Sequence, residues 1–169
     1  MIYGITGPAG SGKDTAGAYI VSTLGATHLS FATPIKAALA AMGFPEPTNR
    51  DDKESTVEGY SFSWRKLAQT LGTDWRKMVD DELWLKLAMN KTKAGTSYVF
   101  TDVRFDLEAN AIRQQGGTII HLDGRKADLQ GLESHASEQG IIMMSQDYFV
   151  DNSGSLDELY TQLKEIICE

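Results

Sequence analysis

The residues with the clearest chemical meaning lie near the start of the chain. Residues 7–13 read Gly-Pro-Ala-Gly-Ser-Gly-Lys, which matches the Gly-x-x-x-x-Gly-Lys spacing of a phosphate-binding loop. Glycines let the backbone bend so that successive N–H groups point inward at phosphate oxygens, and a following helix adds the positive end of its dipole. Lys13 would then neutralise the outer phosphates. The alternative is a glycine-rich turn between a strand and a helix, with an exposed lysine.

This loop predicts which residues contact the phosphates. The expected contacts are Gly7, Ala9, Gly10, Ser11, Gly12, Lys13, Asp14 and Thr15. The residue after Lys13 is Asp14, where such loops usually carry a hydroxyl group for magnesium. Thr15 supplies a hydroxyl one place later, so we expect Thr15 to be a metal ligand.

A second pair of charged residues closes the most strand-like run, residues 98–103. In open α/β sheets the carboxyl ends of the strands face the ligand crevice. Asp102 could therefore hold Mg²⁺ directly or through water, and Arg104 could bind a phosphate through two parallel hydrogen bonds. The alternative is that this pair merely caps the next helix.

Basic and polar residues also gather in the middle of the chain. Arg65 and Gln69 are four residues apart and would share a helix face. A guanidinium suits a monophosphate, and an amide side chain suits the edge of a base. The predicted substrate-binding residues are Lys36, Arg65, Gln69, Thr73, Asp74, Arg76, Trp84 and Arg104. A solvated helix lysine is the alternative for Lys36, and a place in the core is the alternative for Trp84.

The polar stretch 123–140 is a candidate lid. Arg125 and Lys126 open it, and an arginine there could cover the phosphoryl group during transfer, although an ordinary solvated turn is the alternative. His135, Ser137 and Glu138 lie in the same stretch, and a lone histidine is more often structural than catalytic.

Three later assignments complete the candidate residues. His28 and His121 fall within predicted strands, so both are interpreted as structural. Asn152 lies just past the last predicted strand, in a loop on which an adenine ring could rest.

Composition limits the classes of function. The chain has 169 residues, a net charge of −7 and a pI near 4.9. This argues against a general nucleic-acid coat or a membrane-surface binder, which would carry a basic face. No apolar run approaches the 18 residues of a membrane span, and no leader-like segment precedes the first strand. Cys168 is the single cysteine, so we expect a soluble protein of a reducing compartment.

The pattern of apolar residues predicts how these groups are positioned. Short strand-like runs alternate with helical periods, which predicts one α/β domain with about five parallel strands flanked by helices. The expected strands are 2–6, 27–32, 98–103, 118–122 and 148–150. The expected helices are 15–24, 34–42, 64–71, 82–91, one across 107–112 and a closing helix after the capping box of Ser155 and Glu158. Residues 72–74 are predicted to form a turn, and 43–63 have no period.

Together these segments resemble the deoxynucleoside monophosphate kinases of tailed phages, a family of P-loop nucleotide kinases. The resemblance covers nearly the whole chain. It rests on residues 7–15, on 30–36 (Ser-Phe-Ala-Thr-Pro-Ile-Lys), on 65–76, on Leu83-Trp84, on 101–113 with Gly116-Gly117, on His135-x-Ser137-Glu138 and on Asp151-Asn152. An aspartate after the loop lysine is similar to the usual form of this family. The chain differs from the family at Thr33, where aspartate is common, and near Lys77, where a small residue is frequent.

The resemblance implies a three-layer P-loop fold like that of nucleoside monophosphate kinases, with ATP and Mg²⁺ as cofactors. It implies transfer of the γ-phosphoryl group of ATP to a deoxynucleoside monophosphate (dNMP), with residues about 43–92 binding the acceptor and about 123–140 forming the lid. Lys13, Asp102, Arg104 and Arg125 are then the expected catalytic residues, Asn152 a nucleotide contact, and Thr15 and Asp102 the metal ligands. No nucleic-acid polymer or membrane partner is expected. The expected location is the cytoplasm, which is the cytoplasm of the host if a phage encodes the chain.

Two alternative functions stay open at this point. One is a P-loop kinase for another phosphorylated small molecule, such as phosphomevalonate or dephospho-coenzyme A, because related folds share this loop and the strand-end Asp-x-Arg. The other is a nucleotide-binding switch that phosphorylates nothing. The absence of an Asn-Lys-x-Asp base motif and the mid-chain arginines argue against a switch.

Overall fold

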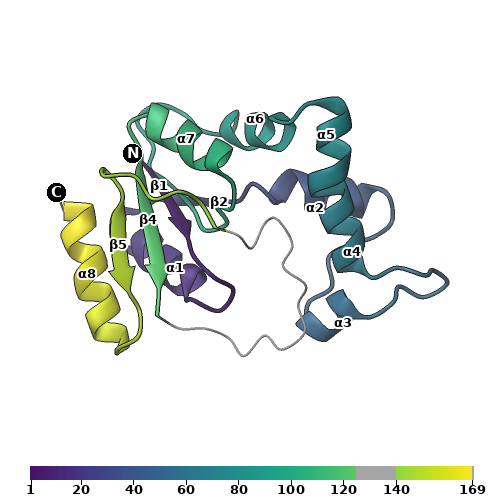
Figure 1. The fold of residues 1–169 in the computed structure, drawn as a ribbon, viewed down its shortest axis with the longest axis horizontal. Helices are drawn as coiled ribbons and strands as arrows, with labels where there is room; N and C mark the ends of the chain where they lie inside the picture. Colours follow the sequence, from purple (N-terminus) through teal and green to yellow (C-terminus); the bar gives the residue numbers. More distant parts are fainter. Residues whose placement is uncertain (125–139, 169) are drawn as a thin grey trace. The chain divides into compact units, whose positions relative to one another are not determined.

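The computed structural model describes residues 1–124 and 140–168 (Figure 1). The chain divides into two compact units. The first combines Met1–Ser30 with Thr92–Glu169, and the second is Phe31–Lys91. The second unit is thus inserted between two parts of the first.

The first unit is built on a five-stranded parallel sheet, as the sequence predicts. Its strands are β1 (Ile2–Thr6), β2 (Thr27–Leu29), β3 (Tyr98–Phe100), β4 (Thr118–Asp123) and β5 (Tyr148–Asp151), in the order β2-β3-β1-β4-β5. Strand β1 is central, and its last residue, Thr6, pairs with His121 of β4. Because all the strands run in one direction, their carboxyl ends share one edge of the sheet, and loops there can form a ligand site.

Two predicted strands are shorter in the structure. β2 ends at Leu29 rather than at residue 32, because helix α2 begins at Thr33 with Pro34 in its first turn. β3 ends at Phe100 rather than at 103, although the Val103 N–H still donates to the Ile5 carbonyl at 3.3 Å. Residues 101–104 are therefore a loop at the ligand edge of the sheet.

Helices cover both faces of this sheet (Figure 1). They are α1 (Lys13–Leu24), α7 (Asp106–Gln114) and α8 (Leu156–Cys168). Alternate residues of a strand point to opposite faces. Tyr3 and Ile5 pack in the core cluster with α1 and α8, whereas a Cβ at the intervening Gly4 would meet Ile112 of α7. The fold is therefore the three-layer α/β arrangement that the sequence predicts.

The N-terminus of the closing helix has the predicted capping box. Ser155 N–H donates to Glu158 Oε2 at 2.6 Å, and Glu158 N–H donates back to Ser155 Oγ at 3.3 Å. Within the described residues, no helix combines the length and the apolar character needed to cross a membrane.

The second unit is helical. Its helices are α2 (Thr33–Ala41), α3 (Arg50–Glu54), α4 (Trp64–Gln69), the π-helical η1 (Thr70–Trp75), α5 (Arg76–Val79) and α6 (Leu83–Met89). The turn predicted at 72–74 is wrong, because α4, η1 and α5 continue into one another and the chain turns only after Val79. Gly72 suits this helical path, since a Cβ there would already lie 3.0 Å from Ile35 Cδ1. The aperiodic stretch 43–63 contains α3 and one antiparallel bridge, Thr56 with Ser63.

The packing of α1 on β3 provides a first test. Gly17 is buried in α1, and a Cβ on it would lie 2.2 Å from Thr101 Cγ2. Alanine is normally favoured over glycine in a helix by about 1 kcal/mol. We expect Gly17→Ala instead to lower the free energy of unfolding by about 1–3 kcal/mol, because the overpacked helix must shift. Urea unfolding measures this difference.

The exposed neighbour Ala18 supplies the control. Ala18→Gly should cost about 0.5–1 kcal/mol, the ordinary propensity loss at an open helix position. A Gly17→Ala protein as stable as the wild type, or more stable, would contradict the close approach of α1 to β3.

Candidate active site

The loop between β1 and α1 is held against the end of β4 and against Asn152. Gly7 has φ +148°, and a Cβ on it would lie 2.1 Å from the Leu122 carbonyl oxygen. Gly12 has φ +96°, and a Cβ there would lie 2.5 Å from Asn152 Nδ2. Both positions therefore require glycine for conformation and for space. The spacing recognised in the sequence thus corresponds to a tightly packed turn that leads into a helix N-terminus.

Asn152 anchors this loop through hydrogen bonds. Its side chain is buried, and Nδ2 donates to the Ser11 carbonyl at 2.8 Å. Its own N–H donates to the Asp123 carbonyl at 2.7 Å, which ties the end of β5 to the end of β4. The adenine contact predicted for Asn152 stays a prediction. The loop anchor is an additional role that the sequence did not indicate.

The side chain of Lys13 folds back over the loop. Its Nζ donates to the carbonyls of Gly7 at 2.8 Å and Pro8 at 2.6 Å. Asp14 and Thr15 follow on the exposed side of the first turn of α1. Ser11 is buried, and its Oγ has no hydrogen-bond partner among the described residues. The loop therefore presents an ammonium group and a polar interior at the helix N-terminus, where anions bind favourably.

The end of β3 brings Asp102 and Arg104 to the same edge of the sheet. Ser30 Oγ donates to Asp102 Oδ2 at 2.6 Å, and His28 Nε2 lies 2.9 Å from Thr101 Oγ1. Glu108 caps α7 at this point, since its Oε2 accepts from the N–H groups of Arg104 and of the following Phe105. The sequence analysis did not single out this buried glutamate.

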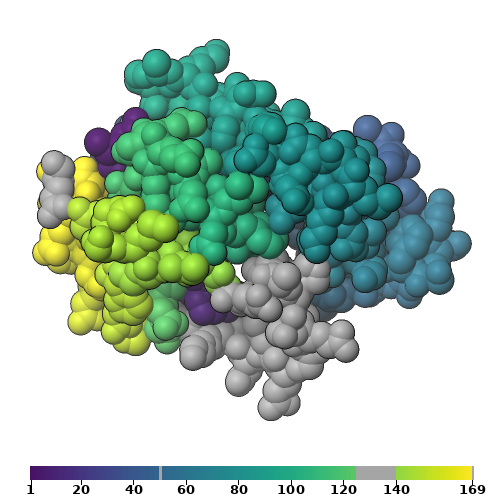
Figure 2. Space-filling view, turned by 45° about the horizontal axis from the view of Figure 1, so that its top comes forward, coloured from purple at the N-terminus to yellow at the C-terminus, as the bar shows by residue number. Residues whose placement is uncertain are grey.

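A cavity of about 320 Å³ lies beside the loop. This is near the lower end of the volumes of small-molecule sites. Its wall includes Lys13 and Arg104, so the structure brings together two of the predicted catalytic cations. The other lining residues are Thr6, Gly7, Pro8, Ala9, Val103, His121, Leu122, Asp123, Gly140, Ile141, Met143 and Phe149. Figure 2 shows purple atoms of the N-terminal segment beside the yellow-green segment that begins at Gly140.

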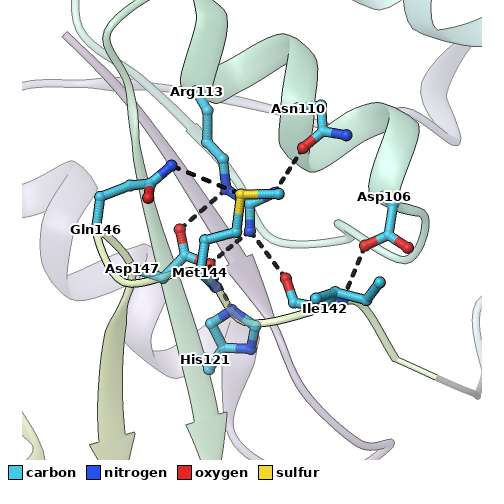
Figure 3. Close-up of polar contacts among 8 residues, drawn as sticks. All are labelled: Asp106, Asn110, Arg113, His121, Ile142, Met144, Gln146 and Asp147. Atoms are coloured by element: carbon cyan, nitrogen blue, oxygen red, sulfur yellow. Dashed lines mark hydrogen bonds and ion pairs between the residues drawn. The ribbon is translucent and has the colours of Figure 1, made fainter.

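A buried carboxylate holds the segment 140–147 in place (Figure 3). Asp147 accepts from Arg113 of α7 through Nε at 3.0 Å and Nη2 at 2.5 Å, and it accepts from Met144 N–H at 2.8 Å. Arg113 Nη2 also donates to the Ile142 carbonyl at 3.1 Å, and Asp106 accepts from Ile142 N–H at 2.8 Å. The part of the cavity wall formed by this segment is thus fixed to α7.

His121 is the third partner of this carboxylate. Its Nε2 lies 3.0 Å from Asp147 Oδ2. Burial disfavours the charge of Asp147, but the hydrogen bonds from Arg113, Met144 and His121 outweigh burial and lower the pKa of the carboxyl below its ordinary value. The sequence analysis missed this cluster because its members are 26 and 34 residues from Asp147, and no local pattern joins them.

The predicted acceptor-site residues of the second unit are partly engaged within that unit. Lys36 Nζ lies 3.0 Å from Glu46 Oε2, and Arg65 forms an ion pair with Glu54. The remaining predicted residues are the half-buried Gln69 and Arg76, the buried Thr73 and Trp84, and the exposed Asp74. Trp84 packs against Trp75 with ring centroids 5.7 Å apart, which agrees with its reading as a core residue.

Glu46 is itself shared between two cations. Lys53 Nζ lies 2.6 Å from Glu46 Oε1, opposite the contact with Lys36. Burial disfavours the charge of Glu46, but the two lysines outweigh burial and lower the pKa of the carboxyl. The candidate lid residues Arg125, Lys126, His135, Ser137 and Glu138 lie outside the described residues.

The comparison with known families identifies the family of this chain. The model of the family described as "Deoxynucleotide monophosphate kinase" matches residues 48–163, more than half of the chain. The chain belongs to the deoxynucleotide monophosphate kinase family. The family resemblance predicted from the sequence motifs is thereby confirmed.

Individual relatives of this family agree. A protein of Acanthamoeba polyphaga mimivirus carrying the family's name is 29% identical over 184 aligned residues, which cover 96% of this chain and 94% of that protein. The deoxynucleotide monophosphate kinase of Enterobacteria phage T4 is 33% identical over 114 residues. That match covers 63% of this chain and 46% of the phage protein, so the kinase described here aligns with about half of its phage relative.

Among solved structures, a gluconokinase from Sinorhizobium meliloti 1021 is similar in fold. It superposes with a TM-score of 0.52 at 15% identity, over 95% of this chain and 87% of that one. At this identity the likeness supports the three-layer kinase fold and nothing about the substrate.

Two oxygen groups of this kinase, a hydroxyl and a carboxylate, are of the kind that magnesium takes. No group of three or more histidine, cysteine or acidic residues able to hold a metal occurs in the part of the chain that the structure describes. Mg²⁺ needs no such cage, because it commonly takes one or two protein oxygens and completes its shell with substrate phosphates and water. The Thr15 hydroxyl and the Asp102 carboxylate are donors of that kind.

The lowered pKa of Asp147 predicts how stability depends on pH. A carboxyl whose pKa is depressed in the folded state stabilises that state above its unfolded pKa, about 3.9. That contribution is lost as the pH falls from there through the lower folded value. We therefore expect Asp147→Asn to lower the free energy of unfolding by about 3–5 kcal/mol near neutral pH, because Arg113 loses its buried partner.

Unfolding of the two proteins between about pH 3 and pH 7 measures this effect. The difference between them should begin to shrink below about pH 4, where the carboxyl of the unfolded chain takes up a proton while that of the folded protein is still ionised. Asp81→Asn, at an exposed position, is the control and should change stability by less than about 0.5 kcal/mol. A difference that stays constant over this range would show that the charge of Asp147 does not contribute.

Proposed function

We propose that this kinase transfers the γ-phosphoryl group of ATP to a deoxynucleoside monophosphate, giving ADP and a deoxynucleoside diphosphate. One observation carries the proposal. The family match begins at residue 48, after the phosphate loop, while residues 7–13 independently form a loop suited to phosphates. Two separate parts of the chain thus support the same activity.

The donor half of the site would be formed by the first unit. The N–H groups of the loop and Lys13 would hold the β- and γ-phosphates of ATP, and Lys13 would exchange its contacts with the Gly7 and Pro8 carbonyls for phosphate oxygens. Thr15 and Asp102 would hold Mg²⁺, which when bound supplies positive charge beside the phosphates. Ser30, hydrogen-bonded to Asp102, would orient that carboxylate.

The acceptor half would draw on the arginines. Arg65 and Arg76 in the second unit would bind the acceptor phosphate, and Gln69 of the same unit would contact the base. The ion pair of Arg65 with Glu54 and that of Lys36 with Glu46 leave these cations ordered before any phosphate arrives. A phosphate that carries two negative charges can replace or share these partly exposed carboxylate partners.

Catalysis would come from position and charge rather than from a covalent intermediate. Phosphoryl transfer has a loose transition state, so holding donor and acceptor in line and stabilising the oxygens supplies most of the rate. Lys13 and Arg104 line one cavity and could meet the charge from two sides. A lid arginine, Arg125, would complete this set and exclude water that could otherwise accept the phosphoryl group.

Lys13→Ala tests the donor half. We expect turnover to fall by about a hundredfold or more, because the charge next to the transferring group is lost, while the melting temperature stays near that of the wild type. A coupled assay of ADP release in the presence of dNMP measures the loss. Lys164→Ala, an exposed change on α8, is the control. Turnover near the wild-type value in the Lys13 variant would remove this lysine from the mechanism.

A panel of acceptors tests the reaction itself. We expect ADP release with one or more of the four dNMPs and little release without an acceptor, because the proposed lid would exclude water from the transfer. The same panel includes the four ribonucleoside monophosphates, phosphomevalonate and dephospho-coenzyme A. Release with one of the last two compounds alone would assign a different kinase substrate, and no release with any acceptor would favour a binding switch.

A further inference from the structure

His121 has two ring nitrogens in different surroundings. It lies on β4 between Ile120 and Leu122, which both pack in the core cluster with α1 and α8. Because residues alternate along a strand, the His121 ring points to the opposite face of the sheet, toward α7. There Nε2 meets Asp147, as Figure 3 shows.

The contact with Asp147 determines which nitrogen carries a proton. An ionised carboxylate only accepts hydrogen bonds, so the His121 nitrogen that faces it must be the donor, Nε2–H. Asp147 is held in its ionised form by Arg113, whose side chain is only 7% exposed. The ring is therefore fixed in orientation and in tautomer. Its other nitrogen, Nδ1, is an acceptor in the neutral ring and a donor in the protonated one.

The Nδ1 atom of His121 makes no structural contact within the described parts of the protein. It has no hydrogen-bond partner among the described residues, and it is not one of the buried polar atoms left without a partner there, so it is open to solvent. His121 lines the cavity beside the phosphate loop, together with Lys13 and Arg104. A structural histidine needs only its Nε2 contact, so the second nitrogen of a ring that lines this cavity has no structural purpose.

We propose that His121 is a further substrate-contacting residue, whose Nδ1, positioned by Asp147, binds a phosphate oxygen of the nucleotide held at the loop. The proposal rests on the donor half of the proposed function. It revises the purely structural role predicted for His121. In the protonated ring, Nδ1–H donates and the imidazolium adds a positive charge, and such charge-assisted hydrogen bonds to phosphate are the stronger class.

Charged groups surround the His121 ring, and they bear on how polyphosphate binding depends on pH. Asp147 lies on one side, supported by Arg113, while Lys13, Arg104 and Asp123 share the cavity wall. Histidine is the side chain that ordinarily changes charge between pH 5 and 8. Protonation of an imidazole adds a donor and a positive charge, so binding of a polyphosphate should gain more from His121 at the lower of two pH values.

Two substitutions separate the two nitrogens. In His121→Gln the side-chain amide can still donate to Asp147 from the place of Nε2, but nothing replaces Nδ1. In His121→Asn the shorter amide replaces Nδ1 and cannot reach the carboxylate. A structural role predicts that glutamine is tolerated and asparagine is not, in stability and in binding alike. The proposal predicts that glutamine preserves the melting temperature and still loses affinity.

The measurement is calorimetric binding of inorganic tripolyphosphate and of ADP to the full chain, at about pH 6 and about pH 8.5. We expect His121→Gln to raise the Kd of tripolyphosphate about tenfold at the lower pH and to leave it near the wild-type value at the higher pH. His28→Gln, at a histidine that contacts Thr101 and does not line the cavity, is the matched control. Its Kd ratio to wild type should be the same at both pH values.

A ratio for His121→Gln that is equal at both pH values, including a ratio of one, overturns the proposal. If that variant does not fold, the wild type still decides, because the chain has only three histidines and the imidazole signals can be followed by NMR. The imidazole signals of His121 must shift when tripolyphosphate is added. Unchanged His121 signals overturn the proposal.

The acceptor panel keeps this inference apart from the proposed function. A protein that phosphorylates no dNMP but shows the pH-dependent ratio retains the His121 contact and loses the proposed acceptor. A protein that phosphorylates dNMPs with a constant ratio retains the reaction and loses the His121 contact.

Discussion

The position of the phosphate loop depends on a close approach of backbone and side-chain atoms that only glycine permits. The Leu122 carbonyl lies beneath Gly7, and the Asn152 amide lies against Gly12, at distances that exclude a Cβ at either position. These contacts fix the position of the loop relative to β4 and to the end of β5, as well as to its own strand β1. The direction of α1, and with it the position of Lys13, follows from that arrangement.

The sheet extends this constraint to the other functional groups. Strand β1 lies between β3 and β4, so the ends of all three strands meet at one edge. Asp102 and Arg104 reach that edge from β3, and His121 and Asp123 reach it from β4. Residues that are more than a hundred positions from the loop in sequence are thereby assembled around one cavity. The buried network of Arg113 and Asp147 then fixes the remaining wall from the α7 side.

Local patterns in the sequence predicted much of this architecture. The phosphate loop, the five strands and the closing helix all carry signals within a few residues, namely glycine spacing, apolar runs and the capping box at Ser155. Two kinds of feature gave no such signal. Asp147 and Arg113 are 34 residues apart and meet only in the folded chain, where residues 142–147 lie against α7. Gly72 reads as a turn residue although tertiary packing makes it part of a helix.

The π-helical segment Thr70–Trp75 has a consequence for how the second unit can vary among relatives. A π turn contains one more residue than an α turn, so it marks a place where a helix has accommodated an extra residue without breaking. Removing that residue would rotate everything beyond it by about 100° around the helix axis. Arg65 would keep its direction while Arg76 turned to another face. Relatives that differ by a single residue in this segment would therefore share their helices and differ in the relative direction of these two side chains.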